Sequence, residues 1–312
     1  MDLFILLLLS CYVNLRPGCN FKQMQILPSK ELTPFIRHYL FLKSEGDTIK
    51  KLRLFSDGNT AMVFSFGSNL ISNVQNNDRL DYLPSSFVYG QLSDFKDLYL
   101  VNEADLVVVV FQPAGLNQIM GLPASEFRDK IISTEDLFGQ KGLSLYGRLF
   151  EQSNLEDKLK MLDTFFIELA TKKVFANHLL VEAAVNFIFK NNGTNSINQL
   201  TKHVGYTERH IERNFVESIG LSPKKFGNII KLHNFLKLLK DKSKQNNLTS
   251  LAYEAGYSDQ SHLIKEFRKY TGITPKEYLY KTNKLTSNFI KFNSTDAAVE
   301  EMSGLYNLHQ KT

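Results

Sequence analysis

One pattern of helix caps, apolar residues and glycines is written twice in the C-terminal half of the chain, and this repeat is the strongest constraint on the fold. The first copy, residues 196–226, reads SINQLTKHVGYTERHIERNFVESIGLSPKKF, and the second, residues 247–278, reads NLTSLAYEAGYSDQSHLIKEFRKYTGITPKEY. Gly205 recurs as Gly256, each followed by a tyrosine. In each copy, polar cap residues precede apolar residues at helical spacing, which predicts two helices per copy.

The helix boundaries follow from the cap residues. Ser196 and Asn247 are good N-caps for the first helix of each copy, and Gln199 follows Ser196 at the spacing of a capping box. Thr207 and Ser258 are placed to cap the second helix. A glycine follows each helix, because glycine adopts the left-handed conformation that ends a helix at little cost. Each copy therefore predicts a helix, a tight turn, a second helix and a stop.

A third helix follows each copy, since Ser222-Pro223 and Thr274-Pro275 place a cap residue before a proline at the first helical position. Apolar residues continue from Pro223 to about Lys240, which predicts one helix that joins the two copies. At 1.5 Å per residue, eighteen residues span roughly 27 Å, about the separation of neighbouring turns along one face of DNA. One chain would then present two recognition helices, as a dimer of single units does.

The second helix of each copy has an outward face suited to DNA. A helix-turn-helix unit inserts this helix into the major groove, where each base pair displays a distinct pattern of donors and acceptors. On a helical wheel anchored on Ile211, Arg209 and Arg213 lie opposite the buried side, with Glu212 beside them. The corresponding part of the second copy carries Gln260, Ser261, His262 and Lys265.

These two unequal units resemble the DNA-binding domain of the AraC/XylS transcription regulators, on the strength of GYTERHIERNFVESIGLSP in the first and AYEAGYSDQSHLIKEFRKYTGITPKEY in the second. The extra residue between glycine and proline in the second copy matches that family's asymmetry. The resemblance covers about 100 residues and implies a cytoplasmic regulator that binds double-stranded promoter DNA and acts with RNA polymerase. By motif position it implies base contacts from Arg209, Glu212, Arg213, Gln260, Ser261, His262 and Lys265.

The distribution of charge along the chain also indicates a DNA-binding role for the C-terminal part. Residues 178–283 contain sixteen Lys and Arg against nine Asp and Glu, a net charge of +7, whereas the whole chain carries +5. A basic module beside a near-neutral remainder is the pattern expected for phosphate binding. For each single lysine, the alternative is that it lies on a solvent-exposed face and contacts no DNA. The candidate phosphate contacts are Lys224, Lys225, Arg268, Lys269 and Lys276.

The N-terminal part has the pattern of a β domain. Between about Gln25 and Leu122, runs rich in β-branched and aromatic residues alternate with Gly, Asn, Asp and Pro clusters. The predicted strands are 35–42, 60–66, 87–89, 98–101 and 106–111, and the predicted helices are 113–120, 143–150 and 155–173. The overall class is α+β, with a mostly β barrel or sandwich that carries helices, followed by an all-α domain.

Segments such as SDGNTAMVFSFG and VVVVFQPAGLNQIMGLPASEF resemble the cupin-like N-terminal domains of some of these regulators. This second resemblance covers about Gln25 to Phe138 and implies a sensing or dimerising role, with an unknown small-molecule effector or a homodimer. The predicted domains are then 24–175 for sensing or dimerisation and 176–283 for DNA binding. Residues 1–23 are interpreted as a leader or start-site extension, and residues 284–312 as a flexible tail.

Other classes of function find little support. The apolar run Leu3 to Leu9 is too short to span a membrane, and Cys11 and Cys19 alone indicate a reducing compartment. Only His38 precedes His178, so we expect no metal centre, no cofactor and no enzyme. Six aromatic residues fit either an apolar ligand pocket or, as we favour, the core. They are Phe55, Phe64, Phe66, Phe87, Tyr89 and Phe111.

Two alternative functions stay open. In the first, the chain binds a ligand or a protein partner, and its helix-turn-helix units no longer read DNA. In the second, an enzyme such as an alkyl transferase is fused to a DNA-binding domain. The second alternative needs a reactive cysteine, and the chain has no cysteine after Cys19.

Overall fold

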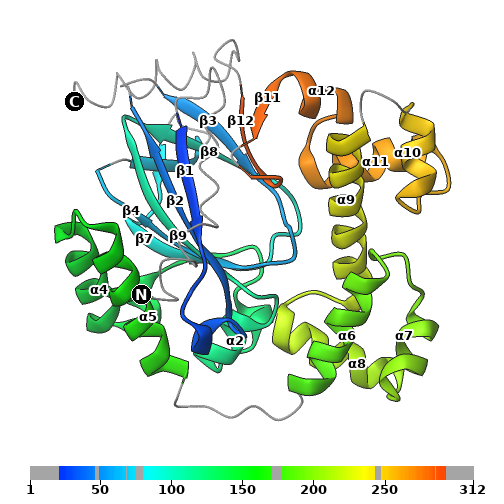
Figure 1. The fold of residues 1–312 in the computed structure, drawn as a ribbon, viewed down its shortest axis with the longest axis horizontal. Helices are drawn as coiled ribbons and strands as arrows, with labels where there is room; N and C mark the ends of the chain where they lie inside the picture. The colour runs from blue at the N-terminus through cyan, green and yellow to red at the C-terminus, as the bar shows by residue number, and fades with distance from the viewer. Residues whose placement is uncertain are drawn as a thin grey trace, which may run out of the picture.

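The computed structural model of the chain describes residues 21–45, 49–67, 69–74, 80–170, 178–242, 247–284 and 286–292. It places a β domain beside a helical domain, with helices α4 (Gln140–Glu151) and α5 (Leu155–Ala170) on the side of the β domain away from the helical one (Figure 1). No helix within these ranges is long and apolar enough to cross a membrane. The predicted class, a mostly β N-terminal domain followed by an all-α domain, is confirmed.

The β domain consists of two antiparallel sheets of six strands each. One sheet has the order β1-β2-β9-β4-β7-β10, and the other has the order β11-β12-β3-β8-β5-β6. The five predicted strand segments coincide with β2, β4, β7, β8 and β9. The strands are β1 (Phe21–Ile26), β2 (Ile36–Ser44), β3 (Lys50–Leu54), β4 (Ala61–Ser65), β5 (Asn69–Val74), β6 (Leu80–Tyr82), β7 (Ser86–Tyr89), β8 (Lys96–Val101), β9 (Ala104–Phe111), β10 (Ile131–Ser133), β11 (Thr282–Lys284) and β12 (Phe289–Phe292).

Strand β9 shows why this part of the sequence is so apolar. Successive side chains of a strand point to opposite faces, so a run of valines places apolar groups on both sides. Leu106 and Val108 face the second sheet, where they share a core with Leu98 and Leu100. Val107, Val109 and Phe111 enter a different core, together with side chains of α4 and α5. The first sheet is therefore covered on both faces, by the second sheet and by helices.

Seven helices form the C-terminal domain within the described residues. In sequence order they are α6 (His178–Lys190), α7 (Ile197–Val204), α8 (Glu208–Ile219), α9 (Pro223–Lys242), α10 (Leu248–Glu254), α11 (Gln260–Thr271) and α12 (Pro275–Tyr280). The predicted connecting helix is confirmed, since α9 is continuous over 20 residues. Helix α6 was not predicted, and its buried side chains complete the core of the first unit. The shorter helices α2 (Gly115–Met120) and α3 (Thr134–Phe138) and the 3-10 turn η3 (Ala124–Glu126) belong to the β domain.

Most of the predicted caps are present. Ser196 and Gln199 form the reciprocal capping box, Thr207 accepts from the His210 amide, and Asn247 accepts from the Ser250 amide. The prediction for Ser258 is wrong by one residue, because Asp259 caps α11 by accepting from the His262 amide at 2.8 Å. The Ser258 hydroxyl instead lies 3.0 Å from the His262 ring. A carboxylate next to the first turn also interacts favourably with the helix dipole.

The segment that follows the second unit returns to the β domain. Strand β12 pairs with β3, and β11 pairs with β12, so residues 286–292 are not the flexible tail that the sequence indicated. The physical reason is that Ile290 is fully buried beside Phe55 and the second-unit core. The Phe55 amide also donates to the Asn288 carbonyl at 3.0 Å, and the Asn288 side-chain amide donates to the Phe55 carbonyl at 3.1 Å. Residues 293–312 lie outside the described ranges.

At the other end, β1 begins at Phe21 and pairs with β2, so residues 21–23 belong to the β domain and not to an extension of it. The rest of the expected extension, residues 1–20, lies outside the described ranges, as does the expected domain boundary near residues 171–177. Helix α6 contributes Leu180, Val181, Ala184, Val185 and Ile188 to the core of the first unit.

We predict that Ile290→Ala lowers the free energy of unfolding by about 2–5 kcal/mol, because it removes a fully buried side chain from a packed core. The measurement is urea unfolding of the full chain. The matched control is Leu179→Ala on α6, whose leucine is 69% exposed and whose loss should cost less than about 0.5 kcal/mol. If both substitutions had the same small effect, residues 286–292 would not pack as described.

Candidate nucleic-acid interface

The first helix-turn-helix unit consists of α7, the turn at Gly205, and α8. Gly205 has a φ of 75°, the left-handed conformation that ends α7 and starts the turn. One side of α8 is fixed by burial of Ile211, Phe215 and Ile219 in the first-unit core. The other side faces solvent. All three predicted residues on it are exposed, namely Arg209, Glu212 and Arg213.

The second unit repeats this arrangement with α10, the turn at Gly256, and α11. Leu263 and Phe267 are fully buried, while Ser261, His262 and Lys265 are exposed. Two of the predicted residues also bond within the unit. Gln260 is half-buried, and its Oε1 accepts from the Thr249 hydroxyl at 2.7 Å. The His262 ring lies 3.0 Å from the Ser258 hydroxyl. Among the predicted base contacts, Arg209, Arg213 and Lys265 are therefore the long cationic side chains that the two recognition helices present to solvent.

Helix α9 holds the two units together. Lys231 of α9 lies 3.3 Å from Glu266 of α11 and 4.3 Å from the centre of the Tyr257 ring. The Asn228 amide donates to the same carboxylate at 3.4 Å. At 1.5 Å per residue, the 20 residues of α9 span roughly 30 Å. This length is close to one turn of DNA.

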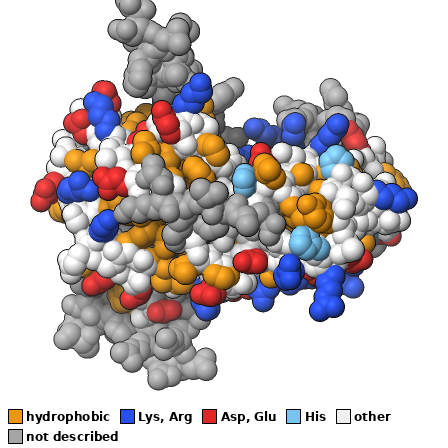
Figure 2. All heavy atoms as spheres, turned by 90° about the horizontal axis from the view of Figure 1, so that it is seen from below, with side chains coloured by type: hydrophobic (Ala, Val, Ile, Leu, Met, Phe, Trp, Pro, Cys, Tyr) orange, Lys and Arg blue, Asp and Glu red, His pale blue; other side chains and the backbone are white. Residues whose placement is uncertain are grey.

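Basic side chains are abundant on the surface of the helical domain. Seen from the end that carries α6 to α8, the right-hand part of the molecule shows more Lys and Arg than acidic side chains (Figure 2). The five predicted phosphate contacts are all exposed, namely Lys224, Lys225, Arg268, Lys269 and Lys276. Lys224 and Lys225 lie in the first turn of α9, and Lys276 lies in the first turn of α12. Each unit thus carries cations beside its recognition helix.

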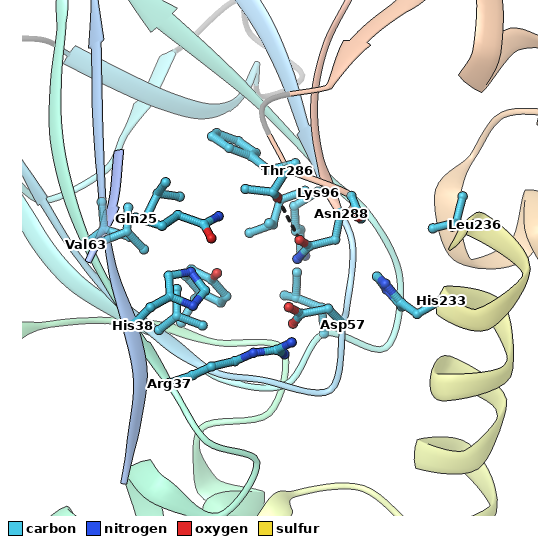
Figure 3. A pocket seen from close by; sticks show the side chains of 18 of the residues that line it. Gln25, Arg37, His38, Asp57, Val63, Lys96, His233, Leu236, Thr286 and Asn288 are labelled. Atoms are coloured by element: carbon cyan, nitrogen blue, oxygen red, sulfur yellow. Dashed lines mark hydrogen bonds between the residues drawn. The ribbon is translucent and has the colours of Figure 1, made fainter. Parts of the chain in front are cut away.

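A cavity of about 940 Å³ lies where the β domain faces α9. Its walls come from three parts of the chain: the inner strands of the β domain, the α9 side chains His233 and Leu236, and the segment that contains Thr286 and Asn288 (Figure 3). Leucine, isoleucine, valine and phenylalanine make up about half of the lining residues. The lining cations Arg37, Lys96, Lys237 and Lys240 outnumber the single carboxylate that lines it, Asp57.

Two histidines of this cavity are held neutral. Burial, reinforced by the nearby Arg37 charge, lowers the pKa of His38 from 6.5 to about 4. Burial also lowers the pKa of His233, whose ring nitrogen lies 3.0 Å from the Ser56 carbonyl. The Arg37 side chain extends toward Asp57 across the opening (Figure 3). At neutral pH the net positive charge of the lining therefore comes from arginine and lysine, and the cavity suits an anionic group.

The six aromatic candidates divide between cavity and core. Phe87 and Tyr89 line the cavity, whereas Phe64, Phe66 and Phe111 pack in the core under α4 and α5. Phe55 is fully buried in the core of the second unit. His38 lines the cavity, a position that the sequence analysis did not predict. Among the described residues, no group of three or more His, Cys, Asp or Glu side chains is placed to hold a metal ion.

Comparison with known families gives two matches on different parts of the chain. Residues 200–281 match a family described as a helix-turn-helix domain, and residues 24–133 match a domain of unknown function, DUF6597. An uncharacterized HTH-type transcriptional regulator of Staphylococcus aureus is 29% identical over 94 residues, 30% of this chain and 12% of that protein. A similar regulator of Haemophilus influenzae is 30% identical over 82 residues, 26% of this chain and 27% of that protein. The chain thus spans a small part of these relatives.

Solved structures with a similar arrangement include ToxT from Vibrio cholerae, at 13% identity and a TM-score of 0.41, covering 78% of this chain and 97% of that one. Another is described as a probable AraC family transcriptional regulator from Rhodopseudomonas palustris. It is 28% identical, with a TM-score of 0.29, and covers 32% of this chain and 93% of that one.

The helix-turn-helix family match falls on the two units and their connecting helix, and the DUF6597 match falls on the β domain. These findings support the predicted resemblance to AraC-type transcription regulators.

We predict that the free energy of unfolding falls as the pH drops from about 6.5 to 4. The unfolded chain protonates His38 near pH 6.5, whereas the folded chain does so only near pH 4, so the unfolded state binds more protons in this window. Above pH 6.5 His38 is neutral in both the folded and the unfolded chain, so its burial costs no stability there. Between pH 7 and pH 4, His38→Gln should lose less free energy of unfolding than the wild-type chain, by up to about 3 kcal/mol, as measured by urea unfolding at both pH values. Equal losses in both proteins would contradict a buried, neutral His38.

Proposed function

We propose that the chain is a sequence-specific DNA-binding transcription regulator, whose two helix-turn-helix units bind neighbouring major-groove segments of promoter DNA under the control of the N-terminal domain. The observation that carries the proposal is the pair of exposed polar and basic faces on α8 and α11, joined by one continuous helix. Residues opposite these faces are buried, so the helices are rigid supports for the exposed side chains.

The residue types on these faces suit direct reading of bases. Arginine donates two hydrogen bonds to the O6 and N7 atoms of guanine, a role that we assign to Arg209 and Arg213. Glu212 would accept from the amino group of cytosine. In the second unit we assign base contacts to four residues, of which Lys265 suits guanine and Gln260 suits adenine. They are Gln260, Ser261, His262 and Lys265.

Phosphate contacts would fix the position of the protein without reading sequence. We assign this role to the exposed cations beside the recognition helices, Lys224, Lys225, Arg268, Lys269 and Lys276. Each neutralised phosphate releases counterions, so each contact steepens the plot of log affinity against log salt concentration by about one unit of slope. We further propose RNA polymerase and a second copy of this chain as protein partners. The exposed apolar side chains Leu143 and Phe150 on α4 support a dimer.

We predict that the full chain, offered random duplex DNA, enriches two short motifs about one helical turn apart. Arg209→Ala should relax the preference within one motif and Lys265→Ala within the other, each at a cost of about 1–3 kcal/mol in binding. The matched control is Lys224→Ala, which should weaken binding to all sequences alike and lower the salt slope by about 1. If no sequence is enriched and the salt slope vanishes, the chain is a ligand-binding or interaction protein instead.

Control by the N-terminal domain is supported by the cavity, since its lining includes side chains of both domains. A small molecule bound there would contact β strands and α9 at once, and it would shift any equilibrium in which that contact changes. We propose an effector with an apolar body, which the leucine and valine side chains would bury, and an anionic group near Arg37 and Lys96. The sign of regulation then depends on whether the filled cavity favours or opposes DNA binding.

We predict that 1-anilinonaphthalene-8-sulfonate, an apolar ring system with one sulfonate, binds in this cavity and gains fluorescence. Arg37→Ala should weaken its binding on the order of tenfold, because it removes a charge-assisted contact with the sulfonate. Arg148→Ala removes an exposed arginine from α4, outside the cavity, and should leave binding unchanged. Equal affinities for all three proteins would show that the probe binds elsewhere.

A further inference from the structure

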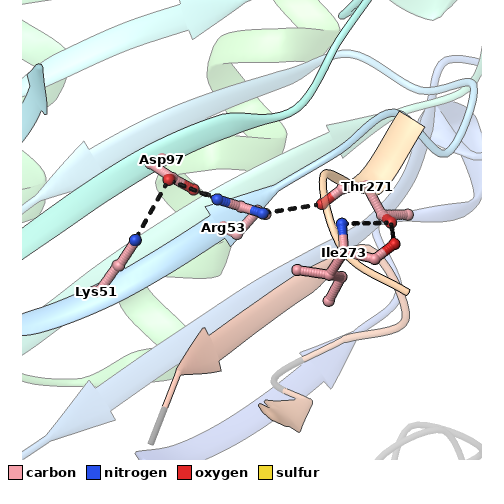
Figure 4. A network of polar contacts seen from close by, with 5 residues as sticks. All are labelled: Lys51, Arg53, Asp97, Thr271 and Ile273. Atoms are coloured by element: carbon pink, nitrogen blue, oxygen red, sulfur yellow. Dashed lines mark hydrogen bonds and ion pairs between the residues drawn. The ribbon is translucent and has the colours of Figure 1, made fainter. Parts of the chain in front are cut away.

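Outside the recognition faces and the cavity, the two domains also contact each other around Arg53 of β3 (Figure 4). Arg53 lies directly opposite Asp97 of β8 in the sheet. Its Nε donates to Asp97 Oδ1 at 2.5 Å, and its Nη2 donates to Asp97 Oδ2 at 2.7 Å. Two parallel hydrogen bonds fix the plane of a guanidinium as well as its position. Only 9% of the Arg53 side chain is exposed.

Two aromatic rings complete the surroundings of this guanidinium. The Phe95 ring centre lies 4.1 Å from Arg53 Cζ, and the Phe292 ring centre lies 5.0 Å from it. Both distances are within the range of cation–π attraction. Phe292 belongs to β12, the strand that follows the second helix-turn-helix unit. The site is therefore assembled from the β domain and from the segment after the DNA-binding domain.

The remaining donor of Arg53 contacts the end of the second recognition helix. Arg53 Nη1 donates to the carbonyl of Thr271, the last residue of α11, at 3.2 Å. This carbonyl lies at the negative end of the helix dipole, where a cation is favourable. Gly272 follows with a φ of 70°, and a Cβ there would lie 2.5 Å from both Arg53 Nη1 and the Phe95 ring. The helix end thus comes closer to Arg53 than any other residue type would permit.

We propose that Arg53 is a positioning residue for DNA reading: by holding the C-terminal end of α11 on the β domain, it fixes the direction of α11 relative to α8 and so the spacing between the two DNA motifs. The inference rests on the proposed reading of DNA by both units. Helix α9 already holds the middle of α11 through Lys231 and Glu266. Arg53 adds a polar contact at the C-terminal end, which opposes pivoting of α11 about its contact with α9.

The size of the effect follows from the length of the helix. From Glu266, where α9 holds α11, the six residues back to Gln260 span roughly 9 Å, so a pivot of about 20° moves the start of the helix by about 3 Å. This is close to the rise of roughly 3.4 Å per base pair. The first unit is held against the same domain, because a Cβ on Gly220 at the end of α8 would lie 2.9 Å from the Ala124 carbonyl of η3. Both recognition helices are therefore placed relative to the β domain.

The test uses the full chain and a DNA series in which the two selected motifs are kept and the spacer between them is lengthened or shortened by one to three base pairs. The wild-type chain should bind one spacer at least tenfold better than its neighbours. Arg53→Ala should bind neighbouring spacers within about threefold of the best one, with unchanged base preferences inside each motif. Lys51, 3.6 Å from Asp97, leaves that carboxylate paired in the variant.

Asp97→Asn weakens the hold on the same guanidinium and should broaden the spacer profile too, while Arg148→Ala should keep the wild-type profile. A purely structural role for Arg53 would lower the affinity for all spacers equally and leave the width unchanged, and that result would overturn the positioning role alone. If the wild-type chain enriched no paired motifs, the proposed DNA reading and the positioning role would fall together.

Discussion

The burial of α9 on several sides is the constraint on which the other parts of the structure depend. Its side chains enter the core of the first unit through Phe226 and Ile230, and the core of the second through Phe235 and Leu239. The same helix meets the β domain, where Gly58 lies so close that a Cβ would come within 2.7 Å of the Phe226 ring. A helix that is apolar on most sides is stable only when each side is covered. Movement of either helix-turn-helix unit would therefore disturb the contacts of α9 with the other unit and with the β domain.

The surfaces between the domains combine apolar packing with a few well-defined polar contacts. His233 lies against the Ser56 carbonyl, and Arg53 contacts the Thr271 carbonyl from a position fixed by Asp97. A cavity lined by residues of both domains has His233 in its wall. Ligand binding and DNA reading would then be coupled through direct contact, because the same helix lines the cavity and carries both recognition units.

Local signals in the sequence predicted much of the helical domain. Ser196, Thr207 and Asn247 act as caps, and the exposed faces of α8 and α11 carry the side chains that the helical wheel indicated. Strand β3 was missed because KKLRL looks like a solvent-exposed segment, whereas Lys51 and Arg53 are buried against Asp97 and aromatic rings. The hydrophobic run of α6 was missed, although Asn177 stands directly before His178 and is of a residue type that caps helices.

The sequence by itself determined the two helix-turn-helix units, their connecting helix and their outward cations, because caps and helical periodicity depend on residues three or four positions apart. Only the tertiary structure decided that residues 286–292 form a strand, that the aromatic candidates divide between cavity and core, and that Arg53 meets the end of α11. Asn288 bonds to the Phe55 carbonyl across 233 positions, and Arg53 bonds to the Thr271 carbonyl across 218. Such pairings depend on how whole domains pack, and no local pattern in the chain encodes them.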